Sequence, residues 1–352
     1  MAERDRLFRG KKQIQQQTIM NAKRITIGLA GDVMLGRNVN EAITGKGYSY
    51  PWGNVLSLLI GTDINIINLE TTMTNCKKRA NKVFNFKATP DKIKTLTEAH
   101  ITAVNLANNH IMDFSEEGLS ETLRTLQDAD IKYAGAGMND QEAGKPVIII
   151  YRNISLGIIG LTDNEPGWRA GPSLCGINYI DVSDRRDREK VLHSILQLGK
   201  EADFIIMSIH WGPNMKERPD PLFVEFAHEM INYGADIIHG HSAHNFQGIE
   251  IYRDKLILYD TGDFVDDYVV DPVLRNDHSF FFIAEVNNGK LCRLQLIPVL
   301  IGECQVNLAS ESESRWSIQR MQQLSAAFGT RITDAGKVIL RNEITTEPNL
   351  LT

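Results

Sequence analysis

Short apolar runs alternate with amphipathic stretches along most of the chain, and this alternation predicts an α/β fold. The apolar runs are rich in β-branched residues and end in polar residues, as buried strands do. Several amphipathic stretches open on a helix-start signal, such as Thr89-Pro90-Asp91 or Ser115 followed by acidic residues. The predicted strands are 24–32, 62–70, 101–110, 203–210, 235–241 and 255–264, and the predicted helices are 52–61, 89–100, 115–130, 188–202 and 221–234.

Two further segments have the pattern of antiparallel strand pairs. Residues 145–163 are two apolar runs around Arg152-Asn153, and residues 278–301 are two runs joined at Asn287-Asn288-Gly289. A helix over 315–329 and a strand over 337–341 are expected to follow. Because no repeat or low-complexity linker interrupts the pattern, we expect one domain over 23–352, after a flexible tail over 1–22.

The composition narrows the class of protein. The chain has 352 residues, of which 42% are hydrophobic, enough for a sizeable core. Its net charge of −6 argues against a nucleic-acid partner, and the basic stretch 76–82 is expected to be a solvated loop. The four cysteines lack metal-site spacing, as in proteins of a reducing compartment. Without a signal-peptide pattern or an apolar run long enough to span a bilayer, the sequence predicts a cytoplasmic protein with no stable membrane anchor.

Polar side chains that can bind metals lie at or just past the ends of the predicted strands. Because ligands of open α/β sheets bind at the carboxyl ends of strands, we expect these side chains to converge on one site. They are Asp32, Glu70, Asn109, His110, His210, His241 and His244.

The donor types narrow the choice of metal. Imidazole, carboxylate and amide oxygen together suit Zn, Mn, Fe or Ni better than Ca. Seven candidates exceed the needs of one tetrahedral ion, so we predict two divalent ions, most simply Mn, Zn or Fe. Such a pair lowers the pKa of a bound water toward about 7 and clamps the attacking and leaving oxygens of a displacement. The predicted ligands are Asp32, Glu70, Asn109, His210, His241 and His244.

Each candidate also has a simpler interpretation. Taken singly, Asp32, Glu70 and Asn109 favour a simpler role, with Asp32 as a helix cap and Asn109 as a turn residue with positive φ. His210 could be a histidine of the core. The cluster of His239, His241 and His244 favours a functional site by itself. The joint pattern also favours a metal site, because the simpler interpretations would otherwise have to coincide at five strand ends. The remaining histidines lack such a context and are expected to be structural or to lie at the surface: His100, His193, His228 and His278.

Two residues next to the predicted ligands suggest proton transfer. His110 follows Asn109, so its ring can point past the metal toward a leaving group and act as a general acid. Asp113 could accept the other ring N–H of His110, or it could cap the helix that begins near Ser115.

His239 shares a strand face with His241 only if the strand continues through Gly240, and we expect Gly240 to end that regularity. His239 is therefore predicted to orient a ligand rather than to bind metal.

Two other motifs carry weaker signals. Residues 31–37, GDVMLGR, could place Arg37 beside a substrate anion, although the spacing of a P-loop is absent. Residues 259–268, YDTGDFVDDY, could line the substrate pocket or form a polar loop, and the sequence does not separate these two possibilities.

Six motifs of the chain resemble those of the CapA/PgsA family, the bacterial capsule or poly-γ-glutamate synthesis proteins. They occur in the family's order: GDVMLGR, NLETTMT, NLANNHIMDF, SIHWG, GHSAHNFQGIE and YDTGDFVDDY. The family belongs to the calcineurin-like metallophosphoesterase superfamily. The resemblance covers nearly the whole chain from Ile25.

The resemblance implies a four-layer α/β/β/α sandwich with a dinuclear metal centre. Met34 stands where the superfamily usually has a histidine, Glu70 where it has a bridging aspartate, and the Gly-His-x-His motif is one residue longer at 240–244. The implied activity is hydrolysis of a phosphoester or of an amide such as a γ-glutamyl bond, in an anionic small molecule or polymer. The alternative is a non-catalytic module that binds an acidic polymer or assists a synthetase.

Overall fold

Two mixed β-sheets form the centre of the computed structural model, which describes residues 24–340. The order in the first sheet is β18 (Gln305–Leu308), β17 (Lys290–Gly302), β16 (His278–Asn287), β1 (Arg24–Val33), β2 (Ile64–Leu69), β5 (Ile101–Asn105) and β6 (Lys132–Ala134), and β15 (Asp263–Val265) also pairs with β1. The order in the second sheet is β13 (Ile249–Tyr252), β14 (Lys255–Leu258), β12 (Ile237–His241), β11 (Phe204–His210), β9 (Ile154–Thr162) and β8 (Val147–Tyr151). The central strands are parallel, β1-β2-β5-β6 in one sheet and β9-β11-β12-β14 in the other.

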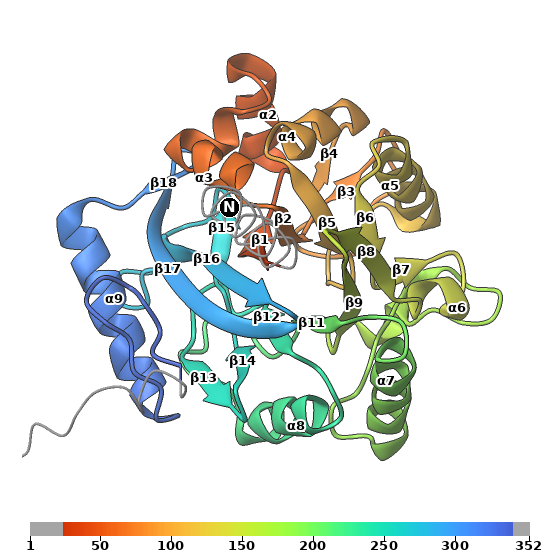
Figure 1. The fold of residues 1–352 in the computed structure, drawn as a ribbon. Helices are drawn as coiled ribbons and strands as arrows, with labels where there is room; N and C mark the ends of the chain where they lie inside the picture. The colour runs from red at the N-terminus through yellow and green to blue at the C-terminus, as the bar shows by residue number, and fades with distance from the viewer. Residues whose placement is uncertain (1–23, 341–352) are drawn as a thin grey trace, which may run out of the picture.

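Helices connect the parallel strands and cover the sheets. They are α2 (Arg37–Lys46), α3 (Leu56–Gly61), α4 (Ile93–Glu98), α5 (Ser115–Asp128), α6 (Asp140–Ala143), α7 (Arg185–Leu198), α8 (Pro221–Asn232) and α9 (Glu311–Ala326), with 3₁₀ turns η1 (Tyr50–Val55), η2 (Pro90–Lys92) and η3 (Pro166–Trp168). Two short sheets, β3 (Thr72–Met73) with β4 (Lys87–Ala88) and β7 (Ala136–Gly137) with β10 (Gly176–Ile177), complete the fold. In Figure 1, α2 to α4 lie at the top of the view and α8 at the bottom, with the strands between them.

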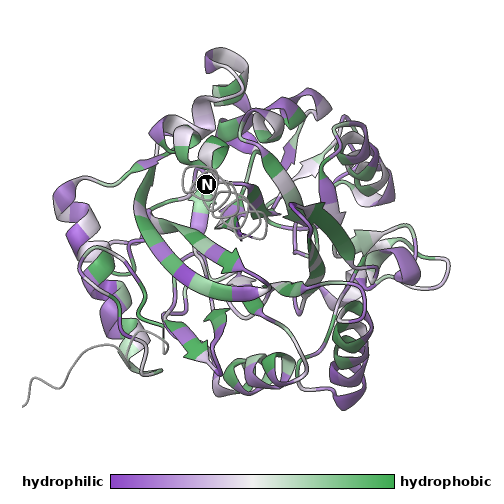
Figure 2. Cartoon of the chain, in the orientation of Figure 1, coloured by the Kyte–Doolittle hydropathy of each residue, from purple (hydrophilic) through white to green (hydrophobic). Residues whose placement is uncertain are grey.

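Three hydrophobic clusters hold these elements together. One contains residues from both sheets, such as Leu29 of β1 and Ile206 of β11, so the sheets face each other across a shared core. The other two lie on the outer faces: α2 to α5 pack on the first sheet, and α7 and α8 pack on the second. Figure 2 shows apolar residues concentrated in the strands, whereas the outer helices are apolar on one side and polar on the other. The predicted mixed α/β class is confirmed.

The alternation of side chains along β11 and β12 determines which residues face the space between the sheets. In β11, Ile205, Met207 and Ile209 face the helices. Phe204 and Ile206 face the first sheet, so Ser208 and His210 continue that inner face.

Some predicted elements differ from those observed. The single strand expected over 255–264 is two strands, β14 and β15, which belong to different sheets. The chain turns between them at Gly262, whose φ is 71°, and both oxygens of Asp260 accept backbone N–H groups there. β5 ends at Asn105, so 106–110 is a loop and not strand.

The sequence patterns also missed α2, β13 and β18. The strand expected over 337–341 is only a pair of isolated bridges at Lys337 and Val338, and Arg341 lies outside the described residues. The tail expected over 1–22 lies outside them too.

The close approach of β12 to the chain after β14 requires a glycine at position 240. A Cβ there would overlap the carbonyl groups of Tyr259 and Leu258, which are backbone atoms and cannot rotate away. We expect Gly240→Ala to lower the free energy of unfolding by about 1–3 kcal/mol, the usual cost of overpacking.

Gly45 provides the control because it lies exposed in α2, and a Cβ there would meet nothing. Gly45→Ala should raise the free energy of unfolding by about 0.5–1 kcal/mol. Urea denaturation of both variants measures the difference, and equal stabilities would show that the close approach at Gly240 is wrong.

Candidate metal centre

Four parallel strands from the two sheets end at one buried cluster of polar side chains. Asp32 lies near the end of β1 and Glu70 directly after β2, while His210 and His241 are the last residues of β11 and β12. These four residues are at most 1% exposed. β11 and β12 are paired so that His210 lies opposite His241. The carboxyl ends of strands from both sheets therefore bring distant parts of the sequence together.

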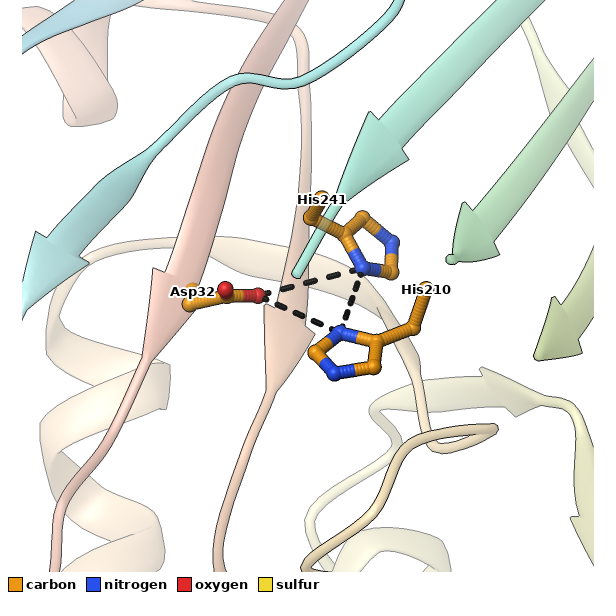
Figure 3. A group of neighbouring side chains, drawn as sticks. All are labelled: Asp32, His210 and His241. Atoms are coloured by element: carbon orange, nitrogen blue, oxygen red, sulfur yellow. Dashed lines mark hydrogen bonds and ion pairs between the residues drawn. The ribbon is translucent and has the colours of Figure 1, made fainter. Parts of the chain in front are cut away.

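Asp32, His210 and His241 form a first group that could hold a metal ion (Figure 3). The Nδ1 atoms of His210 and His241 are 3.0 Å apart, and they lie 3.6 and 3.8 Å from Oδ1 of Asp32. Two nitrogens bound to one tetrahedral zinc ion at the usual bond length would be about 3.3 Å apart. The spacing of the two rings therefore matches that of ligands around one ion.

Hydrogen bonds from Asn68 indicate that His210 presents a lone pair to this group. The Oδ1 atom of Asn68 accepts from the side-chain amides of Asn105 and Asn108, which also donate to backbone carbonyls. The Nδ2 atom of Asn68 is thereby turned toward Oδ1 of Asp32, at 2.6 Å, and Nδ1 of His210, at 3.2 Å. Since Nδ2 can only donate, Nδ1 of His210 is the acceptor.

Asp32, Glu70 and His244 form a second group on the other side of Asp32. Nδ1 of His244 lies 3.7 Å from Oδ2 of Asp32 and 2.8 Å from Oδ1 of Asp263. The hydroxyl of Tyr268 lies 3.3 Å from Oε2 of Glu70. Asp32 is thus the residue shared by both groups, whereas the family resemblance implied that Glu70 bridges the ions.

The high cost of ionising several buried carboxyls together is the dominant electrostatic feature of the site. Burial, together with the charge of Asp32, raises the pKa of Glu70 well above its usual range and that of Asp260 to about 8. Burial and the neighbouring Asp266 and Asp32 raise the pKa of Asp263 in the same way. Within residues 24–340, no lysine or arginine pairs with Asp32, Glu70 or Asp263.

Several oxygens of this cluster also lack a hydrogen-bond partner. They are Oδ2 of Asp32, Oε1 of Glu70, Oδ2 of Asp263 and Oδ1 of Asn109. Buried carboxylates need either a cation or full hydrogen bonding, and these oxygens have neither among the described residues. The residues present therefore fit a site for divalent cations.

The loop after β5 places His110 beside Glu70, while the Oδ1 atom of Asn109, the residue before it, is buried without a hydrogen-bond partner. Nε2 of His110 lies 4.0 Å from Oε1 of Glu70, and its Nδ1 lies 2.6 Å from Oδ2 of Asp113. Of the two roles considered for Asp113, the structure supports contact with His110, because α5 has no side-chain cap at its start.

Phe86 and Lys82, which the sequence patterns missed, contact the pair formed by His110 and Asp113. The ring of Phe86 stacks on His110 with centroids 4.0 Å apart, and its backbone N–H donates to Oδ2 of Asp113. Lys82 forms an ion pair with Oδ1 of Asp113 at 3.2 Å and also bonds to the carbonyl of Asn109. Only spatial neighbours reveal these roles, because both residues lie in an irregular loop with no motif.

Arg37 lies beside Phe86 and Tyr268, two residues that contact the site, and it is already paired. Its guanidinium contacts both oxygens of Asp267, at 3.2 and 2.9 Å, and stands over the rings of Phe84, Phe86 and Tyr268. A substrate anion would therefore meet a guanidinium whose charge is partly balanced. The segment 259–268 contributes Asp263 and Tyr268 to the cluster, and its role in lining a substrate pocket stays a prediction.

His239 lies in the same strand as His241, which corrects the expectation that Gly240 ends the strand. β12 continues through Gly240 to His241, because the absence of a side chain at position 240 lets the strand pass close to Tyr259. His239 and His241 therefore share the inner face. The ring of His239 bonds to Ser208 and to the carbonyl of Ala30, and it is in neither metal group.

Comparison with known proteins identifies the family. Residues 26–268 match the bacterial capsule synthesis protein family, PGA_cap. The chain belongs to this family. The chain is 31% identical to a probable polyglutamine synthesis accessory protein of Mycobacterium tuberculosis, over 88% of this chain and 93% of that protein. The resemblance to CapA/PgsA proteins is thus confirmed.

Two relatives come from Bacillus species. The capsule biosynthesis protein CapA of Bacillus anthracis is 29% identical over 70% of this chain and 60% of its own length. The PGA biosynthesis protein CapA of Bacillus subtilis is 28% identical over 74% of this chain and 68% of its own length. A solved structure, TT1561 of Thermus thermophilus, matches with a TM-score of 0.41 and 12% identity over 75% of this chain and 98% of its own, too low a similarity to establish a shared fold. No helix within residues 24–340 is long and apolar enough to cross a membrane.

The shared position of Asp32 leads to a test by metal content. We expect Asp32→Asn to weaken binding of both ions, and His244→Ala to weaken binding of one, because only Asp32 belongs to both groups. Elemental analysis after dialysis measures the bound metal. His228→Ala is the control, since His228 bonds to Glu250 and stacks on Tyr252 away from both groups. Full metal content in Asp32→Asn would contradict the assignment.

Proposed function

We propose that this protein is a metal-dependent hydrolase of a phosphoester or of an amide such as a γ-glutamyl bond. The observation that carries the proposal is the buried cluster of Asp32, Glu70 and three histidines, whose unpaired oxygens and ring nitrogens converge with no cation among the described side chains. The two sheets facing each other, with helices outside both, support the four-layer sandwich that the superfamily resemblance implies.

The two groups define how the chain would hold two ions. Asp32, His210 and His241 would bind one, and Asp32, Glu70 and His244 the other, with the free Oδ1 of Asn109 as a further ligand. Such ions, when bound, supply a water of lowered pKa and positive charge beside the reacting group. Asp263 contacts Nδ1 of His244 and would fix the orientation of this ring.

His110 is the candidate for moving a proton. Burial lowers the pKa of its ring to about 4, although the bond to Asp113 opposes this shift, so the ring is neutral at physiological pH. Because Asp113 accepts the N–H at Nδ1, the lone pair lies at Nε2, on the side of Glu70. His110 would therefore accept at Nε2 the proton that the attacking water loses and then donate it to the leaving group.

The family suggests the kind of substrate. Its relatives are named for polyglutamine synthesis, capsule biosynthesis or PGA biosynthesis. We propose an anionic substrate, a polymer end or a small molecule, whose charge would lie near Arg37. Proposed ions of Mn, Zn or Fe fit the mixed nitrogen and oxygen donors.

The role of His110 leads to a comparison of two leaving groups. For a substrate with an alkyl leaving group, His110→Ala should lower kcat by about 10²–10⁴, the usual value of a positioned acid. The loss should be much smaller for a nitrophenyl ester, because nitrophenolate leaves without a proton. Metal content should stay unchanged, and His228→Ala serves as the control that removes a remote imidazole.

Two outcomes would contradict these assignments. Equal losses on both substrates would show that His110 is not the acid. If the wild-type protein binds metal but hydrolyses neither these two esters nor a γ-glutamyl amide, while it binds an acidic polymer, the non-catalytic binding role is correct instead.

A further inference from the structure

A continuous chain of hydrogen bonds connects a backbone carbonyl of the first sheet to His241 in the second. Nε2 of His239 lies 3.0 Å from the carbonyl oxygen of Ala30, and its Nδ1 lies 3.2 Å from Oγ of Ser208. The same Oγ lies 3.0 Å from Nε2 of His241. His239, Ser208 and His241 are all completely buried, so water does not compete for these bonds.

The direction of each hydrogen bond in this chain follows from the carbonyl oxygen of Ala30, where the chain begins. A backbone carbonyl can only accept, so Nε2 of His239 carries the hydrogen. A neutral ring with its hydrogen on Nε2 has its lone pair on Nδ1, so Nδ1 of His239 is an acceptor toward Ser208. The hydroxyl of Ser208 must then donate to His239. Its oxygen is left to accept from Nε2–H of His241.

This direction determines which nitrogen of His241 is free. A neutral ring with hydrogen on Nε2 has its lone pair on Nδ1, the atom that lies 3.0 Å from Nδ1 of His210 and 3.8 Å from Asp32. Nδ1 of His210 also carries a lone pair, which accepts from Asn68, so an ion bound there would replace that hydrogen bond. Three acceptors thus face one another, an arrangement that is favourable only around a cation.

We infer that Ser208 and His239 are positioning residues, which fix His241 in the tautomer that offers Nδ1 to a metal ion. The inference rests on the proposed metal site but not on hydrolysis. It also explains why a third histidine is buried beside the candidate ligands without belonging to either metal group. Ser208 lies opposite His239 in the pairing of β11 with β12, so strand register alone places its hydroxyl between the two rings.

The tautomer can be measured directly in the Zn²⁺-loaded protein. With ¹⁵N-labelled histidine, long-range ¹H–¹⁵N correlation spectra distinguish a ring protonated at Nε2 from one protonated at Nδ1. We expect His241 of the wild-type protein to be protonated at Nε2 only. Ser208→Ala should allow both tautomers, and Ser208→Thr, which keeps the hydroxyl, should restore the single form.

Ser317 provides a matched control. It is also a completely buried serine whose Oγ bonds to a histidine ring, here Nδ1 of His278 at 2.8 Å. Ser317→Ala removes the same atom from an equally buried position, but it should leave the His241 signals unchanged. A general effect of deleting a buried hydroxyl would appear in both variants.

Metal affinity provides the second measurement. Competition with a chromophoric chelator for Zn²⁺ should show Ser208→Ala and His239→Ala binding about 10–100-fold more weakly, the usual effect of losing a partner of a ligating histidine. Ser208→Thr and Ser317→Ala should bind like the wild type.

The inference is wrong if wild-type His241 is protonated at Nδ1, a result that needs no variant to fold. It is also wrong if Ser208→Ala changes neither tautomer nor affinity. A wild-type protein that binds Zn²⁺ with the expected tautomer but hydrolyses nothing would refute the proposed function alone.

Discussion

The need to neutralise buried negative charge dominates the chemistry of this protein. Asp32, Glu70, Asp260 and Asp263 lie together where the strands of both sheets end, and each is at most 2% exposed. A carboxylate that is removed from water costs several kcal/mol unless a cation or hydrogen bonds compensate for it. The described residues supply donors from asparagine, histidine and Tyr268, and backbone N–H groups to Asp260, but no lysine or arginine. Divalent ions are therefore the partners that we propose for this cluster.

The fold supplies rigidity around that charge. The ligands stand on the ends of buried strands, and the pairing of β11 with β12 fixes His210 beside His241 and Ser208 beside His239. Two hydrogen-bond networks, one through asparagines and one through His239, begin at backbone carbonyls and end at the two histidines. Because backbone atoms of a sheet do not move independently, the ring orientations are set before any ion binds.

The sequence predicted much of the fold and the set of candidate residues, for a physical reason. Buried parallel strands are continuous apolar runs, and a polar residue after such a run, such as His210, stands out. The sequence could not predict the turn at Gly262 that sends residues 255–265 into two sheets, because that turn depends on contacts with Asp260. Gly240 was misread for a similar reason: only the neighbouring backbone of Tyr259 shows that it permits the strand rather than ends it. Phe86, Lys82 and Ser208 carry no motif, and only their spatial neighbours reveal what they support.

The most direct test of the metal centre is a crystal structure measured at the absorption edge of the bound metal. The account predicts an anomalous peak about 2.0–2.2 Å from Nδ1 of both His210 and His241 and from an oxygen of Asp32. A second peak should lie on the side of Asp32 that faces Glu70 and His244. A structure in which these side chains surround only water, after growth in the presence of Mn²⁺ or Zn²⁺, would contradict the account.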